Sequence, residues 1–197
     1  MATRFEEISA TFWDAPDPGT DPATGPGADA PPEAHGGDDA RHPPLTDEGV
    51  AEAERTLGVT LPPELLTLLR LRNGGTVSTR RDAFPTERPN AWADDHVPFD
   101  ELLGIGDPED GVSLVETPYL VQEWGLPSPV VLLSGDGHTW IALDYRSCGP
   151  HGRPPVVLLA AADGSGPAAV TPLAPDFRSF VEGLTGAEQF RDDDPEA

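Results

Sequence analysis

The chain has 197 residues, enough for one ordinary domain with short extensions. It carries 35 acidic against 12 basic side chains, for a net charge of −23, and such an excess of carboxylates repels phosphate groups. The composition therefore argues against nucleic acid and anionic membrane surfaces as partners and favours a basic protein, although the same charge also suits plain solubility.

Cysteine content and hydropathy indicate the cellular compartment in which the protein is expected. Cys148 is the only cysteine, which excludes an intrachain disulfide and a thiol-rich metal site. The first 14 residues contain no continuous apolar run of the signal-peptide kind, and the longest apolar run, 156–162, is far too short to span a membrane. We therefore expect a cytoplasmic protein.

Composition divides the chain into three zones. Residues 1–44 are predicted to form a short amphipathic helix over 1–13 and then a disordered linker, since 14–44 hold 8 Pro and 5 Gly in 31 residues. Residues 45–190 are the predicted folded domain, and 191–197 form an acidic tail. The predicted domain alone has a net charge of −13, so its acidity is not confined to the termini.

The domain is predicted to open with two helices. Thr46 suits an N-cap, and Gly58 suits the left-handed position that ends the first helix. Pro62-Pro63 begins the second helix, and Asn73-Gly74-Gly75 ends it. The second helix is expected to be buried through its leucines: Leu65, Leu66, Leu68, Leu69 and Leu71.

The rest of the domain alternates short apolar runs with turn residues. An irregular stretch over 76–95 is followed by a predicted strand over 96–105, which Pro98 interrupts, and a short helix over 118–124. Further strands are predicted over 130–133, 140–145, 156–160 and 169–173. A last helix begins near Pro175-Asp176. This order predicts an α+β fold: an N-terminal helical pair, a mostly antiparallel sheet and a closing C-terminal helix.

Three ordered motifs carry a resemblance. They are Leu57-Gly58-Val59 with Leu61-Pro62-Pro63 and Asn73-Gly74-Gly75, then the hairpin around Gly135-Asp136-Gly137, then Pro175-Asp176-Phe177 in the closing helix. Together they resemble the SUKH superfamily, which includes the fungal cell-wall-assembly regulators and many bacterial immunity proteins. The resemblance covers 45–184 and implies an α+β domain without catalytic residues or cofactor. It also implies that the partner is a toxin, whose identity does not carry over.

The candidate chemical sites are weak. Asp136, His138, Asp144 and His151 include zinc-ligand types, but Asp136 suits a turn and His151 lies in a predicted loop. The helical pair could also be a DNA-binding helix-turn-helix motif. Its second helix, however, has too many leucines to present the polar face that a recognition helix needs. Enzyme chemistry has no positive support, so we predict a non-enzyme.

Charge is the clearest remaining feature. Eight acids and no arginine lie between 94 and 116: Asp94, Asp95, Asp100, Glu101, Asp107, Glu109, Asp110 and Glu116. They are either a solvated face or a docking surface for a basic toxin such as a nuclease. Trp92, Phe99, Tyr119 and Trp124 lie nearby in sequence as candidate anchors or core.

Three functions therefore remain open. The first is an immunity protein that masks a toxin surface. The second is a regulatory or scaffolding interaction module with no link to a toxin. The third is an enzyme that uses the Asp136/His138/Asp144 hairpin, and it predicts a bound metal.

Overall fold

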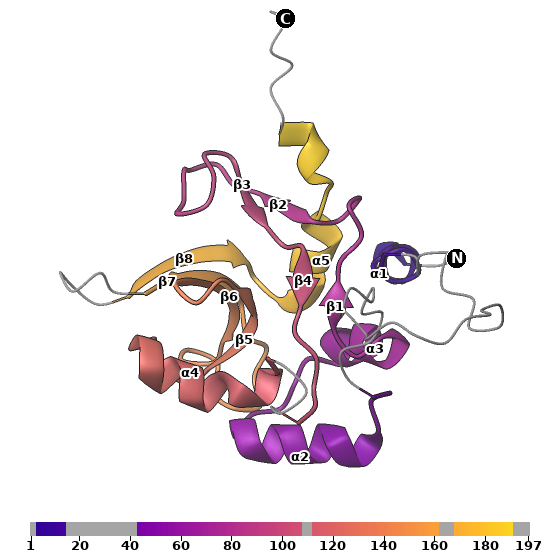
Figure 1. Cartoon of the computed structure of the whole chain (residues 1–197), viewed down its shortest axis with the longest axis vertical. Coiled ribbons are helices and arrows are strands. Elements are labelled where there is room, and N and C mark those ends of the chain that lie inside the picture. Colours follow the sequence, from indigo (N-terminus) through magenta and orange to yellow (C-terminus); the bar gives the residue numbers. More distant parts are fainter. Residues whose placement is uncertain (1–2, 15–42, 108–111, 162–167, 191–197) are drawn as a thin grey trace, which may run out of the picture.

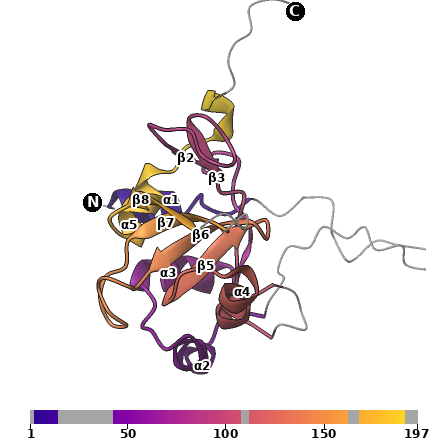
Figure 2. The same cartoon turned by 90° about the vertical axis from the view of Figure 1, so that its left-hand side faces the viewer.

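The computed structural model describes residues 3–14, 43–107, 112–161 and 168–190. The predicted linker, apart from its two ends, and the acidic tail lie outside these residues, as does the turn predicted over 163–167. The described elements form an α+β arrangement, as the sequence predicted (Figures 1 and 2).

The two predicted helices are confirmed, with the expected boundaries. Helix α2 spans Asp47–Leu57; the Thr46 hydroxyl accepts the Gly49 N–H at 3.1 Å, and Gly58 ends the helix at φ 70°. Helix α3 spans Pro63–Leu71 and has no side-chain cap. A proline at the first helical position loses no hydrogen bond there, so it begins the helix without cost.

Burial of the leucines in α3 is only partly as expected. Leu65, Leu68 and Leu69 are fully buried, whereas Leu71 is 61% exposed. Residues two apart on a helix do not share a face, so Leu71 lies on the side away from Leu69. The prediction that Leu71 is buried is therefore wrong.

The central sheet is a four-stranded antiparallel meander. Its strands are β5 (Val130–Gly135), β6 (Thr139–Asp144), β7 (Val156–Ala160) and β8 (Ala169–Ala174), in that order across the sheet. Every residue of β6 is buried, so both faces of the sheet are covered near its centre. Outer strand β8 is largely exposed, contains Pro172, and pairs with β7 through a register irregularity at Val156/Val157.

Between α3 and the sheet, four short strands replace the irregular stretch and single strand that were predicted. Strand β1 (Gly75–Thr76) pairs with β4 (Glu101–Leu102), and β2 (Ala83–Pro85) pairs with β3 (His96–Pro98). The chain changes partner after Phe99: the Phe99 N–H still donates to the Asp82 carbonyl beside β2 at 2.7 Å, whereas the Asp100 carbonyl accepts the Val77 N–H beside β1 at 2.8 Å.

The N-terminal segment belongs to the core. Helix α1 spans Arg4–Ser9, shorter than the predicted 1–13. A capping box between Thr3 and Glu6 caps its N-terminus. Phe5, Ile8 and Phe12 are buried as their spacing predicted. After α1 the segment runs extended, and Trp13 forms a β-bridge with Val77 and donates its indole N–H to the Leu68 carbonyl at 3.2 Å.

Two further helices complete the packing. Helix α4 (Thr117–Trp124) follows the 3-10 turn η2 (Leu114–Glu116) and contacts β5, and helix α5 (Phe177–Gly183) contacts α1, α3 and β8. Figure 2 shows α4 and α5 on opposite sides of the sheet. The short turn η3 (Ala187–Phe190) contacts β3. Within the described ranges, no helix is long and apolar enough to cross a membrane.

Candidate functional site beside helix α2

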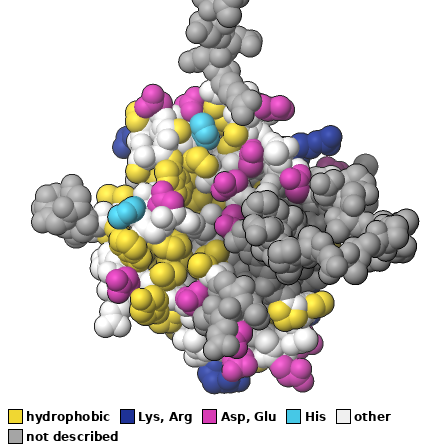
Figure 3. Space-filling model, in the orientation of Figure 1, with side chains coloured by type: hydrophobic (Ala, Val, Ile, Leu, Met, Phe, Trp, Pro, Cys, Tyr) yellow, Lys and Arg dark blue, Asp and Glu magenta, His cyan; other side chains and the backbone are white. Residues whose placement is uncertain are grey.

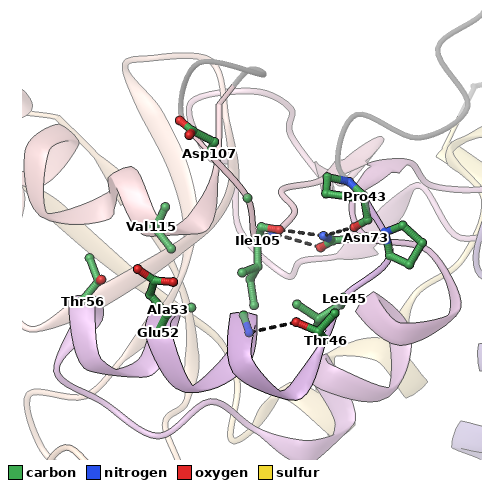
Figure 4. A pocket seen from close by; sticks show the side chains of 13 residues that line it. Pro43, Leu45, Thr46, Glu52, Ala53, Thr56, Asn73, Ile105, Asp107 and Val115 are labelled. Carbon is green, nitrogen blue, oxygen red and sulfur yellow. Dashed lines mark hydrogen bonds between the residues drawn. The ribbon is translucent and has the colours of Figure 1, made fainter.

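A pocket of about 620 Å³ opens between helix α2 and the segment that follows β4 (Figure 4). This volume lies within the range of ordinary ligand pockets. Apolar side chains line both sides of the pocket, and its polar lining residues are Thr46, Glu52, Thr56, Asn73 and Asp107. The lining residues that matter for its chemistry are Leu45, Glu52, Ala53, Ile105, Asp107 and Val115.

Asn73 holds the pocket walls together. Its side-chain amide donates to the Pro43 carbonyl at 2.8 Å and to the Ile105 carbonyl at 2.6 Å, and its oxygen accepts the Ile105 N–H at 2.9 Å. The side chain is almost fully buried, 4% exposed, with every one of these bonds made inside the fold. Asn73 thus joins three segments that are far apart in sequence.

Glycine 74 allows the walls to approach. At φ 87° it has a backbone conformation that side chains rarely adopt, and a Cβ here would lie 2.6 Å from the Gly104 nitrogen. Gly104 in turn pairs with Ser113, which is fully buried and donates its hydroxyl to the Gly104 carbonyl at 3.1 Å. The segment that begins at Gly104 therefore lies between Gly74 on one side and Ser113 on the other.

Two carboxylates give the pocket its charge. Glu52 lies on the side of α2 that faces Val115, and Asp107 lies on the opposite wall (Figure 4). No arginine or histidine lines the pocket among the described residues. Within the same part of the chain, Glu52 makes no hydrogen bond or ion pair and is exposed. The pocket therefore combines an apolar interior with two acidic residues.

The eight predicted acids do not converge on this pocket. Only Asp107 lines it, while Glu109 and Asp110 lie outside the described residues. The other five follow the chain: Asp94 and Asp95 precede β3, Asp100 and Glu101 lie at β4, and Glu116 lies in η2. Their role as a docking surface stays a prediction.

These carboxylates differ in how far they are engaged. Glu116 accepts the Ser113 N–H at 3.0 Å and completes a capping box, so it has a structural role. Asp95 contacts His96, with 2.8 Å between Oδ1 and Nδ1. Asp94 and Asp100 are exposed, and neither side chain makes an ion pair within the described ranges. Asp94 and Asp100 are therefore the most available to a partner's cations.

The four candidate aromatic anchors separate into core and surface. Phe99 is fully buried, Trp92 and Trp124 are half-buried, and Tyr119 is 61% exposed. The Trp92 indole N–H donates to Asp136 Oδ2 at 2.7 Å. Figure 3 shows hydrophobic side chains gathered over α4 and the nearby ends of the sheet strands, with carboxylates around them.

The residues suggested for a metal have other partners. Asp136 accepts the backbone N–H groups of His138 and Thr139 at 2.9 and 2.8 Å. Burial alone would raise the pKa of Asp136, but these bonds and the one from Trp92 outweigh it and hold the pKa below its ordinary value.

Two of the other three candidates also have hydrogen-bond partners, and the third, His138, packs its ring against Trp124 with ring centroids 4.9 Å apart. Asp144 receives two hydrogen bonds from the Arg146 guanidinium, at 2.8 and 2.7 Å, and His151 Nδ1 lies 2.8 Å from the Thr60 hydroxyl. Among the residues described, no three His, Cys, Asp or Glu side chains are grouped closely enough to hold a metal ion.

The fold and the site together define an α+β domain with a pocket that contains two acidic residues and, within the described ranges, with exposed carboxylates such as Asp94 and Asp100 that make no ion pair. A model of the SMI1/KNR4 family (SUKH-1) matches residues 44–183. Because the match covers most of the chain, this protein belongs to the SMI1/KNR4 family. Searches of curated proteins and of solved structures found no match.

The pocket was not predicted from the sequence. Asn73-Gly74-Gly75 was interpreted as helix punctuation, and the motif does follow α3, but its asparagine and first glycine hold the pocket. An asparagine beside two glycines is compatible with a close backbone approach as well as with a helix end, so the motif alone does not indicate the pocket. Nothing in the sequence indicated Glu52, one of several acids on α2.

Proposed function

We propose that this chain is a non-catalytic, cytoplasmic immunity protein that neutralises a basic protein toxin by covering its surface. Two observations support the proposal. The chain belongs to the SMI1/KNR4 family, whose superfamily includes bacterial immunity proteins. Its acidity also extends to the folded surface, which is what attraction to a basic partner requires.

The surface charge carries the proposal. The described residues include 22 acids against 10 arginines. Exposed pairs such as Arg70–Asp47 neutralise few of these acids, so a strong negative field remains. Opposed fields raise the association rate of two proteins and disfavour partners of the wrong sign.

The mode of inhibition follows from the same field. Enzymes that act on nucleic acid bind phosphate through cationic side chains. Carboxylates such as Asp94 and Asp100 would engage those cations in place of the substrate. Tyr119 and the half-buried Trp92 and Trp124 would add the aromatic contacts that commonly dominate binding free energy.

Co-expression tests the proposal directly. The toxin domain encoded next to this gene should arrest growth when expressed alone and should be tolerated when this chain is present. A toxic domain that this chain neither binds nor counteracts would contradict the proposal. Recovery of resident cytoplasmic partners, with no toxin gene nearby, would instead favour the scaffolding module.

Charge-neutral variants then locate the surface. We expect Asp94→Asn with Asp100→Asn to lower the association rate several-fold and to weaken its dependence on salt, because exposed charges mainly affect encounter. The control is Glu7→Gln with Glu48→Gln, which removes the same charge from exposed residues of α1 and α2, outside residues 94–116. Equal effects from the two pairs would show that net charge alone matters.

A further inference from the structure

The pocket beside α2 has a composition that restricts what it can bind. Leu45, Ala53, Ile105 and Val115 give it an apolar interior, and Glu52 and Asp107 are its two acidic residues. An anionic ligand would be repelled by the Glu52 carboxylate. A purely apolar ligand would bury Glu52 without a partner, which is costly for a charged group.

A cationic group on an aliphatic stem satisfies both parts of the pocket. Arginine buries its methylene stem along apolar surface while its guanidinium stays near polar groups. The guanidinium has five donors in a planar arrangement that matches carboxylate oxygens. The volume of about 620 Å³ leaves room for such a side chain together with water.

We infer that this pocket receives an arginine side chain of the protein partner. The inference rests on the proposed function, because it names the contact through which a basic partner is recognised. Glu52 is the principal carboxylate, since it lines the pocket, is exposed, and makes no hydrogen bond or ion pair within the part of the chain described. Asp107 lines the other wall and has an interaction of its own.

Butylguanidine is the first probe, because it carries the guanidinium and stem without a peptide. Titrated into the full-length chain at millimolar concentration, it should cause saturable NMR shifts at the amides of residues 45–56 and 105–115. Its neutral isostere butylurea should cause markedly smaller shifts. Shifts that do not saturate, or equal shifts with both compounds, would overturn the inference.

A pair of glutamate variants isolates the charge. Glu52→Gln should weaken butylguanidine binding roughly two- to fivefold, the range for a partly exposed ion pair. Glu48→Gln removes the same charge from the same helix, but Glu48 does not line the pocket, so binding should stay near the wild-type value. Equal weakening by both variants would reduce the effect to net charge and overturn the inference.

Two leucine variants on α2 test whether the protein partner uses this pocket. Gly49 lines the pocket, and a Cβ there would make only ordinary contacts, 3.4 Å to the Thr46 hydroxyl and 3.7 Å to Leu45. Gly49→Leu should fill the pocket and lower affinity for the partner at least tenfold, whereas Ala51→Leu, at an exposed position of the same helix that does not line the pocket, should leave affinity near the wild-type value. Thermal unfolding of both variants confirms that they fold.

The outcomes separate this inference from the proposed function. If the toxin is neutralised but Gly49→Leu binds it as well as Ala51→Leu does, the pocket inference is wrong and the proposed function stands. If no variant, nor the wild type, binds the toxin, the proposed function fails, while the butylguanidine titration still decides whether the pocket selects a guanidinium.

Discussion

At the scale of single residues, Asn73 is the side chain that joins segments far apart in the sequence. It bonds to Pro43 and Ile105 while remaining buried. A buried backbone group that loses its partner costs about 1–3 kcal/mol. The pocket wall therefore depends on one amide.

We expect Asn73→Ala to lower the free energy of unfolding by about 2–4 kcal/mol, because it leaves the Ile105 N–H and two carbonyls without this partner. Urea unfolding measures the loss. Asn90 is the control: it also bonds the backbone, to His96, Trp92 and Ala93, but it is only partly buried, so Asn90→Ala should cost about 1 kcal/mol. Equal losses would contradict this account.

Asp144 predicts a pH dependence of stability. Hydrogen bonds from the Arg146 guanidinium outweigh burial and hold the pKa of Asp144 below its ordinary value. The folded state therefore binds this proton less readily than the unfolded state does. The resulting stability is fully present above about pH 4, the ordinary aspartate pKa, and is lost as pH falls through the folded value.

Asp144→Asn should therefore be less stable than wild type by about 1–2 kcal/mol at pH 7, with the difference shrinking below about pH 4. Unfolding free energies measured from pH 7 to pH 3 test this. Asp47→Asn should change little at any pH, because its pair with Arg70 is exposed. A difference that stays constant with pH would rule out the Asp144 carboxylate as the cause.

At the scale of elements, helix α2 contains glycines with opposite roles. Gly49 lies inside the helix, where alanine is favoured by about 1 kcal/mol. Gly58 ends the helix at φ 70°, a conformation that costs other residues about 1–2 kcal/mol. Position within the helix, and not residue type, decides what each glycine contributes.

We therefore expect Gly49→Ala to raise the melting temperature and Gly58→Ala to lower it. Calorimetry on the two single variants provides the comparison. Each serves as the control for the other, since both add the same methyl group. Two shifts of the same sign would show that helix propensity and the left-handed cap do not explain this segment.

The elements also show which features the sequence can predict. Helices α2 and α3 and the four-stranded meander follow from local rules: caps, proline at a first turn, and alternation between turns. Strands β1 to β4 do not, because they are two or three residues long and depend on partners distant in sequence. The pocket was missed for the same reason, since Asn73 and Ile105 meet only after folding.

At the scale of the whole molecule, the folded unit extends beyond the family match, which begins at residue 44. Phe12 is fully buried and packs against Phe99, with ring centroids 6.4 Å apart. The segment over 3–14 therefore contributes to the same core as the matched domain. Its apolar spacing was visible in the sequence, but its packing partner was not.

Phe12→Ala should cost about 3–5 kcal/mol, as expected for a large side chain removed from a closed core. Chemical denaturation monitored by tryptophan fluorescence would measure it, with Trp13 beside the altered site. Thr11→Ala changes an exposed neighbour and should stay within about 0.5 kcal/mol of wild type. A small loss for Phe12→Ala would mean that the N-terminal segment is dispensable.

The outer strand β8 has a consequence for how any complex forms. Pro172 has no N–H to donate, and the irregular register at Val156/Val157 distorts the strand pair beside it. Another polypeptide that pairs with β8 would therefore meet an edge on which the regular ladder of main-chain hydrogen bonds is interrupted. We therefore expect recognition at this edge to depend on side-chain contacts. Single substitutions there can change what the molecule binds and leave its backbone unaltered.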